Sequence, residues 1–330
     1  MRRLGCFVVS LCLSIGTGMA VVSPEYVSPD TLFRIVSYNV ENLFHPDSDS
    51  LNLSLNPDTD FTPDGKYHWT YTKYRRKVQN IAQVITHIGQ FDGVDIVGLC
   101  EVENEQCISD LCTVLRRFDY RYIHFDSPDR RGIDVALLYR SATFRPLTTY
   151  PIPIALSDGG TTRDILYVSG IYYHSDTLHL FLCHLPSQLD GAAETNWKRN
   201  EVLAILQQHI DSLKTLNASA KIVIMGDMNS APKETISGMH NGMLRLEKQT
   251  DMPYGTHKYK GVWSFLDQFY VSDNLLDKAS IYVFSAPYLL EEDTRFLDLK
   301  PKRTYIGYRY QAGYSDHLPI VMTIKTIVEN

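Results

Sequence analysis

The segment Ile222-Val223-Ile224-Met225-Gly226-Asp227-Met228-Asn229 carries the pattern that decides the predicted fold. Its first four residues are apolar and predict a buried strand, which ends at Gly226-Asp227. A carboxylate and an amide therefore follow directly from a buried strand. The same segment is also compatible with an ordinary turn, because Gly, Asp and Asn favour turns for their own conformational reasons. The choice between the two interpretations depends on how the other strands of the chain end.

Other apolar runs also lead into polar side chains. Such side chains lie at one end of the strands predicted at residues 32–38, 94–99, 178–183, 267–271 and 318–324. The complete set is Asn39, Glu41, Glu101, His184, Asp227, Asn229, Asp267, Asp316 and His317. Taken singly, Glu101 is explained equally well as an exposed charge and His184 as a core histidine. For Ser315-Asp316-His317-Leu318-Pro319 a capping turn is the less favoured alternative. Because so many strands share the feature, we expect these side chains to meet at one edge of the sheets.

Strands and helices alternate along the chain. Further strands are predicted at residues 120–125, 135–139 and 165–173, and helical spacing of apolar residues predicts helices near residues 74–88, 111–118 and 202–213. Residues 43–69 are rich in Asp, Pro, Asn and Ser and predict a long loop. Strands dominate both halves, which favours two sheets packed face to face with helices outside. No Pro/Gly linker divides the chain, so we expect residues 21–330 to form a single domain.

Residues 1–20 predict a secretory signal peptide. Arg2 and Arg3 supply positive charge, residues 4–15 are apolar, and Gly18-Met19-Ala20 supplies the small residues of a cleavage site. A buried first helix is the alternative, although neither an amphipathic period nor a cap supports it. We therefore expect an exported protein, periplasmic or extracellular after cleavage. Beyond residue 20 no stretch is long and apolar enough to span a bilayer, so no transmembrane segment is predicted.

Charge and cysteine content narrow the function. Loss of Arg2 and Arg3 takes the formal net charge from −6 to −8, so a generally basic surface for long nucleic acids is absent. Cys100 and Cys183 precede candidate site residues and are predicted to be small core residues. Cys107 and Cys112 are spaced i,i+5 on a helix, which is poor geometry for a disulfide. No CxxC or Cys/His zinc spacing occurs, which disfavours a structural zinc.

The strand-end set contains the groups that phosphate ester hydrolysis needs. Carboxylates hold Mg²⁺ or Mn²⁺, which stabilises the negative charge of the phosphoryl oxygens in the transition state. An Asp can orient or deprotonate the attacking water, and an Asn amide or a His can donate to the phosphoryl oxygens. A His paired with a second Asp has a fixed tautomer and a raised pKa, which favours the imidazolium.

Six motifs in order resemble the endonuclease/exonuclease/phosphatase superfamily, which includes pancreatic deoxyribonuclease, abasic-site endonucleases, bacterial sphingomyelinases and inositol polyphosphate 5-phosphatases. The resemblance covers roughly residues 30 to 326. The motifs are Ser37-Tyr38-Asn39-Val40-Glu41-Asn42-Leu43-Phe44, Gly98-Leu99-Cys100-Glu101-Val102, Cys183-His184-Leu185, Gly226-Asp227-Met228-Asn229, Leu266-Asp267-Gln268-Phe269 and Ser315-Asp316-His317-Leu318-Pro319. The resemblance implies an α/β four-layer sandwich of two packed mixed, mainly antiparallel sheets flanked by helices. It also implies Mg²⁺ or Mn²⁺ as cofactor.

The resemblance implies a role for each position. The metal ligands would be Glu101, chiefly, with Asn39, Glu41 and Asp316 completing or supporting the site. Asp227 would activate or orient the water, and Asn229 would hold the phosphate or that Asp. The groups at the substrate phosphate would be Asn39, Arg163, His184 and His317, with His317 paired to Asp267. A surface salt bridge to Asp164 is the alternative for Arg163.

Two departures from family members bear on the substrate. Position 41 is Glu where several nucleases of the superfamily carry Asp, and position 184 is His, as in the deoxyribonuclease and sphingomyelinase branches, where abasic-site endonucleases carry Tyr. The second departure, together with export, weakens an assignment to base-excision repair.

Three functions remain open. The first is an exported phosphodiesterase or phosphatase acting on a small molecule or a lipid head group. The second is a secreted nuclease, supported by the clusters Tyr74-Arg75-Arg76-Lys77, Arg130-Arg131, Lys258-Tyr259-Lys260 and Lys302-Arg303-Thr304-Tyr305, in which cations can meet phosphates and aromatics can stack on bases. The third is a non-enzymatic binding protein on the same fold. No obligate protein partner is inferred.

Overall fold

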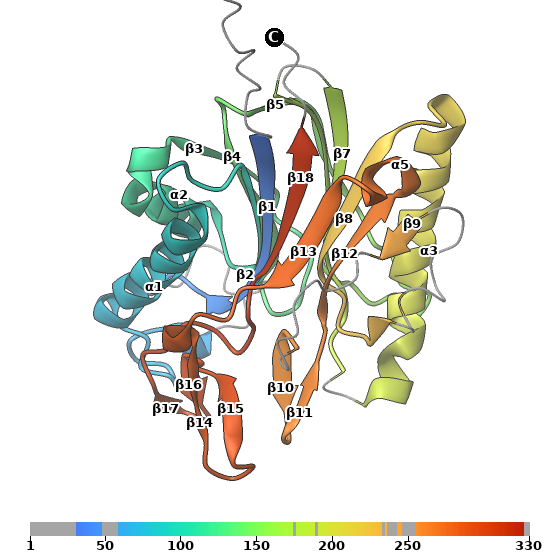
Figure 1. Cartoon of the computed structure of the whole chain (residues 1–330). Coiled ribbons are helices and arrows are strands. Elements are labelled where there is room, and N and C mark those ends of the chain that lie inside the picture. The colour runs from blue at the N-terminus through green and yellow to red at the C-terminus, as the bar shows by residue number, and fades with distance from the viewer. Residues whose placement is uncertain are drawn as a thin grey trace, which may run out of the picture.

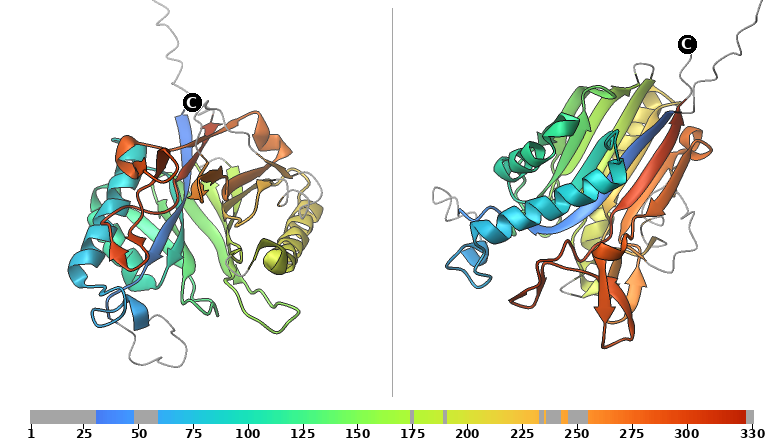
Figure 2. Two further views of the ribbon diagram at one scale, coloured as in Figure 1. Left: turned by 90° about the horizontal axis from the view of Figure 1, so that it is seen from below. Right: turned by 60° about the vertical axis from the view of Figure 1, so that its left-hand side comes forward.

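The computed structural model describes residues 31–47, 59–173, 176–188, 191–232, 235, 243–245 and 255–326. The predicted signal peptide, residues 1–20, lies outside the described residues. The described chain forms two six-stranded sheets that pack face to face, with helices on both outer sides (Figure 1, Figure 2). The predicted fold class, an α/β four-layer sandwich of two mixed, mainly antiparallel sheets flanked by helices, is confirmed.

Each sheet contains strands from distant parts of the chain. The first sheet has the order β13 (Ala279–Val283), β18 (Ile320–Thr326), β1 (Thr31–Leu43), β2 (Ile96–Val102), β4 (Asp134–Arg140) and β3 (Tyr120–His124). The second has the order β5 (Phe144–Ile152), β6 (Ile165–Tyr172), β7 (Asp176–His184), β8 (Lys221–Asp227), β12 (Asp267–Ser272) and β9 (Met243–Arg245). Three hairpins lie outside the sheets: β10 (His257–Tyr259) with β11 (Val262–Ser264), β14 (Leu290–Asp293) with β15 (Asp298–Pro301), and β16 (Tyr305–Ile306) with β17 (Arg309–Tyr310).

The helices cover the outer faces of the sandwich. They are α1 (Tyr71–Gly89), α2 (Glu105–Val114), α3 (Ala192–Leu216) and the short α5 (Asp273–Leu276), with 3-10 turns η1 (Thr59–Phe61), η2 (Arg116–Phe118) and η3 (Pro287–Leu289). Helices α1 and α2 lie against the first sheet and α3 against the second (Figure 1). Thr70 caps α1 by accepting a hydrogen bond from the Lys73 backbone N–H.

Residues 222–225 of strand β8 are all apolar because the strand is covered on both faces. Val223 and Met225 belong to the core between the sheets, whereas Ile222 and Ile224 pack on the other face, in the core beneath α3. Neighbouring side chains of a strand point to opposite faces, so a strand covered on both faces needs apolar residues at every position. The buried strand predicted at residues 222–225 is thereby explained.

One parallel pair lies at the centre of each sheet. Strand β1 runs parallel to β2, and β7 runs parallel to β8, while every other pairing in the two sheets is antiparallel. Parallel neighbours end at the same edge, so the C-terminal residues of these four strands are delivered to one edge of the sandwich. Strands β12 and β18 run antiparallel to β8 and β1, so both start at that edge.

The structure adds elements that hydrophobic patterning did not predict. Strand β5 contains Pro146 and Pro151 and exposes much of one face, as edge strands do, so it lacks the apolar signal of a central strand. Strand β13 has five residues and each strand of the three hairpins has four or fewer, so none is long enough to give a clear alternating pattern in sequence. Strand β1 also continues five residues beyond the predicted end, to Leu43, and carries Asn39 and Glu41 within it.

The four cysteines outside residues 1–20 are free. Cys100 and Cys183 are fully buried, as predicted for small core residues. None of the described helices is long and apolar enough to cross a membrane.

Gly226 sits where β8 lies closest to β7. Its φ is +137°, and a Cβ built on it would lie 1.8 Å from the Cys183 carbonyl oxygen. An L-residue would therefore have to adopt an unfavourable backbone conformation and push the two strands apart. Asp227 follows directly, so the close approach of β7 and β8 at this glycine helps to set the position of the Asp227 carboxylate.

We expect Gly226→Ala to lower the free energy of unfolding by roughly 2–4 kcal/mol, because it combines backbone strain with a backbone clash. Gly159→Ala is the matched control: Gly159 also has a positive φ, +74°, but nothing lies within 4 Å of its added Cβ. The control should cost about 1 kcal/mol, the price of the left-handed conformation alone. Urea unfolding of both variants measures the difference, and equal midpoints would contradict the role given to the close approach of β7.

Candidate active site

The predicted site residues come together at the edge where the two parallel pairs, β1 with β2 and β7 with β8, end. This is the lower edge in Figure 1. Register fixes this: His184 pairs with Asp227 across β7 and β8, and Asp267 pairs with Asp227 across β8 and β12. Asn39 pairs with Cys100, next to Glu101, across β1 and β2. Strand pairing thus makes neighbours of residues far apart in sequence: Ser37 pairs with Ile320 across β1 and β18, and just beyond that pair Ser315 Oγ donates to the Asn39 carbonyl at 2.7 Å.

One carboxylate oxygen, Asp227 Oδ2, is the centre of this arrangement. It accepts a hydrogen bond from Asn39 Nδ2 at 3.0 Å, and His184 Nε2 and His317 Nε2 lie 3.7 and 3.8 Å away. The other oxygen, Oδ1, accepts the Asn229 backbone N–H at 2.9 Å. Burial raises the pKa of Asp227 to about 6, since the charged form loses solvation; the nearby His317 opposes that shift.

His317 is held by a second carboxylate. Its Nδ1 lies 2.7 Å from Asp267 Oδ2, and both side chains are buried. Burial acts to lower the pKa of His317, but the negative charges of Asp267 and Asp227 outweigh it, and the pKa is raised well above 6.5. The imidazolium is therefore the form present at neutral pH, with its Nε2–H directed toward Asp227.

His184 differs from His317 in protonation. Burial, reinforced by the positive charges of Arg163 and Arg131, lowers its pKa well below 6.5, so it is neutral. Its Nδ1 is buried without a hydrogen-bond partner, and its Nε2 faces Asp227 and Glu101. The site therefore holds one neutral and one charged imidazole on either side of the same carboxylate.

Arg163 is buried behind His184. Its guanidinium donates to the backbone carbonyls of His184 and Leu185 at 3.0 and 3.1 Å and pairs with Asp129 at 2.8 Å, so the predicted alternative partner, Asp164, is not the one it uses. Asn229 Nδ2 donates to the Leu185 carbonyl as well, at 3.0 Å. These contacts make Arg163 and Asn229 supports of the segment that carries His184, and a direct contact with phosphate stays a prediction for both.

Glu101 and Asn39 form the side of the site that belongs to the first sheet. Asn39 Nδ2 lies 3.3 Å from Glu101 Oε1, and its Oδ1 accepts the Glu41 backbone N–H, so the amide presents N–H groups rather than oxygen to the centre. Glu101 Oε2 accepts the Asn42 backbone N–H at 2.9 Å, with Arg131 3.6 Å away.

Several residues of this edge have left-handed backbone conformations. The φ values of the four non-glycine residues Glu41, Asn42, Glu101 and Asn229 lie between +46° and +69°. Such conformations are costly for residues other than glycine and gather where function requires a fixed side-chain direction.

Glu41 and Asp316 are joined by an arginine. Arg303 Nε donates to Glu41 at 3.1 Å and its Nη2 to Asp316 at 2.7 Å. Buried Lys77 lies 3.9 Å from Glu41 and donates to the Tyr314 carbonyl at 2.7 Å. Burial lowers the pKa of Lys77 to about 8, against the pull of Glu41. The buried carboxylate of Glu41 and the partly exposed one of Asp316 are thus compensated by two cations of the chain itself. The predicted role of both carboxylates as metal ligands stays a prediction.

The model of the Endonuclease/Exonuclease/phosphatase family matches residues 34–326. The chain belongs to this family. Comparison with curated protein sequences gives no match.

Solved structures with the same fold share little sequence with this family member. Truncated TDP2 from Caenorhabditis elegans is 17% identical, with a TM-score of 0.57 over 89% of this chain and 98% of that chain. The catalytic domain of human Nocturnin, with a bound sulfate anion, is 16% identical, with a TM-score of 0.56 over 89% of this chain and 95% of that chain. A mannosyl-6-phosphatase from Bacteroides thetaiotaomicron is 16% identical, with a TM-score of 0.56 over 88% and 99%. At these identities the likeness establishes the fold alone.

The donor chemistry of the site fits a hard divalent cation, as expected for a family that is typically metal-dependent. Glu101, Asp227 and Asp316 offer carboxylate oxygens, which Mg²⁺ and Mn²⁺ prefer. The thiols of Cys100 and Cys183 lie beneath the site, but burial raises the pKa of each, so they provide no thiolate for a soft metal. His257, Asp316 and His317 form a further group with ligand atoms within 4.8 Å of one another, although the proton held by His317 competes with a metal there.

Sequence reasoning did not assign the cations and His257 to the site. Lys77, Arg131 and Arg303 each belong to a basic cluster that the sequence showed, but spacing alone does not reveal that they face carboxylates. His257 lies outside every motif and reaches the site through a bridge to His317. Its only sequence signal is its position ten residues before Asp267.

Asp267→Asn should lower the pKa of His317. Burial lowers this pKa, and the substitution removes one of the negative charges that raise it. NMR titration of the histidine ring protons in metal-free protein measures this, with His317→Asn identifying the resonance. Asp158→Asn, in an exposed loop, serves as the control and should leave the titration unchanged. An unaltered His317 titration in Asp267→Asn would show that the pair does not determine the imidazolium.

Proposed function

We propose that the chain is an exported phosphoesterase that uses Mg²⁺ or Mn²⁺ to hydrolyse a small or lipid-linked phosphate ester. The observation that supports it most directly is the surroundings of Asp227 Oδ2: one amide donor, one neutral imidazole and one imidazolium lie within 3.8 Å. This places a base and three donors around one small volume, as in-line attack of water on phosphorus requires. The family assignment supports a phosphoesterase fold.

Asp227 is the proposed base. A carboxylate whose pKa is raised to about 6 is deprotonated at neutral pH, yet it is more basic than an ordinary Asp. Asn229 and Asn39 fix its two oxygens through hydrogen bonds, so its free lone pairs have a defined direction. Asp227 orients the water, and the proton passes to Asp227 as the oxygen attacks phosphorus.

The two imidazoles act on the phosphate. His317 donates a hydrogen bond from Nδ1–H to Asp267. Its Nε2–H is then left to donate to a phosphoryl oxygen, where negative charge grows in the transition state. His184, being neutral, donates through one ring nitrogen to the phosphate or to the leaving oxygen. Asn39 contributes its amide N–H groups on the side of the first sheet.

Glu101 would hold the metal, with support from Asp316 and Glu41. Asn39, whose Oδ1 accepts the Glu41 backbone N–H, would act through its amide N–H groups instead. A bound Mg²⁺ or Mn²⁺ supplies positive charge to the phosphoryl oxygens. Arg303 keeps Glu41 and Asp316 in place through its two hydrogen bonds. Arg163 is a positioning residue in this proposal, because its guanidinium holds the carbonyls beside His184.

Internal pairing of the basic clusters favours a small or lipid-linked phosphate over nucleic acid. Lys77, Arg131 and Arg303 face site residues, and Lys258 pairs with Asp298 at 2.8 Å. In each of the four clusters, one cationic side chain is therefore paired within the protein. Less positive charge is left to bind a polyanion. Tyr305 of the last cluster is likewise buried against Tyr67, whereas Tyr308 beyond it is exposed.

Asp227→Asn should reduce turnover about 10²- to 10⁴-fold, the usual contribution of a positioned base. The assay is a panel of phosphorylated sugars, nucleotides, phospholipids and plasmid DNA with Mg²⁺ or Mn²⁺, with circular dichroism to establish that the variant is folded. Turnover of the plasmid alone would favour the nuclease. No turnover of any compound by the wild type, or equal turnover by wild type and Asp227→Asn, would defeat the enzymatic proposal and favour a binding protein.

Export follows from residues 1–20 and is part of the proposal. N-terminal sequencing of protein recovered outside the cytoplasm of a bacterial host should give a chain that starts after Ala20. A chain that stays in the cytoplasm with Met1 or Arg2 at its start would contradict export without affecting the proposed chemistry.

A further inference from the structure

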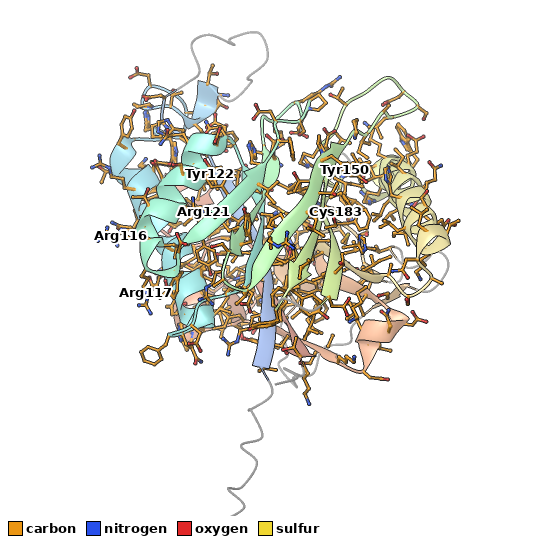
Figure 3. All side chains as sticks on the ribbon, turned by 90° about the horizontal axis from the view of Figure 1, so that it is seen from above. Arg116, Arg117, Arg121, Tyr122, Tyr150 and Cys183 are labelled. Atoms are coloured by element: carbon orange, nitrogen blue, oxygen red, sulfur yellow. The ribbon has the colours of Figure 1, made fainter. Side chains whose placement is uncertain are left out.

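A second group of potential metal ligands lies away from the centre formed around Asp227. His124 is the last residue of β3, Asp134 is the first of β4, and Asp126 lies at the start of the connection between them. The ligand atoms of these three side chains all lie within 4.8 Å of one another. Figure 3 labels Tyr122 on β3 and Tyr150 on β5, which are edge strands of the two sheets.

His124 has a buried nitrogen without a partner. Its side chain is only 5% exposed, and its Nε2 makes no hydrogen bond. This nitrogen lies 3.5 Å from Asp134 Oδ2, and the other ring nitrogen, Nδ1, lies 3.9 Å from Asp126 Oδ1. An unsatisfied buried nitrogen aimed at a carboxylate needs an explanation, because such groups are normally paired.

The separation fits a shared cation better than a hydrogen bond. Two ligands of a tetrahedral Zn²⁺, each about 2.1 Å from the metal, lie about 3.4 Å apart. The 3.5 Å between His124 Nε2 and Asp134 Oδ2 matches that spacing, whereas an N–H···O hydrogen bond is usually about 2.9 Å long.

The carboxylate is already oriented for such a role. Asp134 Oδ1 accepts hydrogen bonds from the backbone N–H and the hydroxyl of Ser127, which leaves Oδ2 for His124. Outer hydrogen bonds of this kind fix the direction of a metal-binding carboxylate. Asp134 also lines a cavity with Asp164. Burial, with a smaller contribution from the charge of Asp134, raises the pKa of Asp164.

We propose that His124, Asp126 and Asp134 form a second divalent-cation site, of the zinc type, at the base of the loop formed by residues 125–133. A single ion binds one ring nitrogen, and His124 Nε2 with Asp134 Oδ2 is the pair at ligand spacing. The Asp126 carboxylate, which lies nearer Nδ1 on an exposed side chain, turns toward the ion on binding. One imidazole with two carboxylates is a ligand set suited to Zn²⁺, and a water completes the tetrahedron. The site lacks cysteine and has no zinc spacing in sequence, because strand pairing between β3 and β4 brings its residues together. Its existence does not depend on the proposed hydrolysis.

The loop that this site closes carries two residues that serve the candidate active site. Asp129 pairs with Arg163, which holds the carbonyls beside His184. Arg131 donates to Asn42 Oδ1 and lies 3.6 Å from Glu101. A cation that joins the two ends of the loop restricts its motion, and thereby holds Asp129 and Arg131 in position.

Zinc binding to the full mature chain tests the site. Isothermal titration with Zn²⁺ alone should show an equivalent that remains in Glu101→Gln and is lost in Glu101→Gln/His124→Asn. Asp126→Asn, at a side chain that is 89% exposed and so not needed for folding, should weaken this equivalent at least about tenfold. His45→Asn is the matched control, because His45 lies 3.9 Å from Asp47 but outside the metal-ligand groups of the described chain, and it should bind as the wild type does.

Trypsin digestion gives a second readout without reference to activity. Arg130 is exposed in the loop, so Zn²⁺ should slow cleavage after Arg130 and Arg131 in the wild type and in Glu101→Gln, but not in Asp126→Asn. The proposal is overturned if His124→Asn leaves the Zn²⁺ stoichiometry unchanged, or if Zn²⁺ leaves loop cleavage unchanged in the wild type. Because Glu101→Gln removes the proposed catalytic ligand but keeps this site, either idea can fail without the other.

Discussion

The parallel pairing of β1 with β2 and of β7 with β8 is the constraint on which the rest of the structure depends. In sheets that are otherwise antiparallel, these two pairs direct four strand ends to one edge. Packing of the sheets face to face then brings the ends of both pairs together, so Asn39 and Glu101 from one sheet meet Asp227 and His184 from the other. The hydrogen bonds of the sheets thus set the positions of the strand ends, and side-chain contacts such as those of Arg163 and Arg303 complete the site.

That edge gathers more negative charge than a protein interior accepts without compensation. Glu41, Asp227 and Asp267 are each at most 5% exposed, and burial penalises an unpaired carboxylate. Cationic side chains of the protein compensate this charge. Arg303 pairs with Glu41 and Asp316, and Lys77 lies near Glu41. The His317 imidazolium pairs with Asp267 and faces Asp227. Protonation of His317 is therefore a consequence of the carboxylates around it, and it gives the site a proton donor at a pH where a free imidazole is largely neutral.

Only those parts of the fold and the site that leave a local pattern in the sequence could be predicted from it. The polar residues Glu101, His184 and Asp227 were predictable because each follows an uninterrupted apolar run at the end of a central strand, and a segment covered on both faces must be apolar. Strand β5 was not predictable, because its prolines and exposed face resemble a loop. Arg303 and Lys77 were visible only as members of basic clusters. Their contacts with Glu41 join positions 262 and 36 residues apart, and no local pattern encodes such pairing.

The basic clusters show how a sequence feature changes meaning once the fold is known. In sequence, a cluster such as Lys302-Arg303 suggests a surface for phosphates of nucleic acid. In the structure, Arg303 bridges the carboxylates of Glu41 and Asp316, and Arg131 lies between Asn42 and Glu101. Charge that is already paired contributes little to the long-range attraction of a polyanion, since that attraction depends on net potential at the surface. Both residues instead hold acidic groups at fixed positions, and a compact phosphate ester needs such fixed positions more than it needs a broad positive surface.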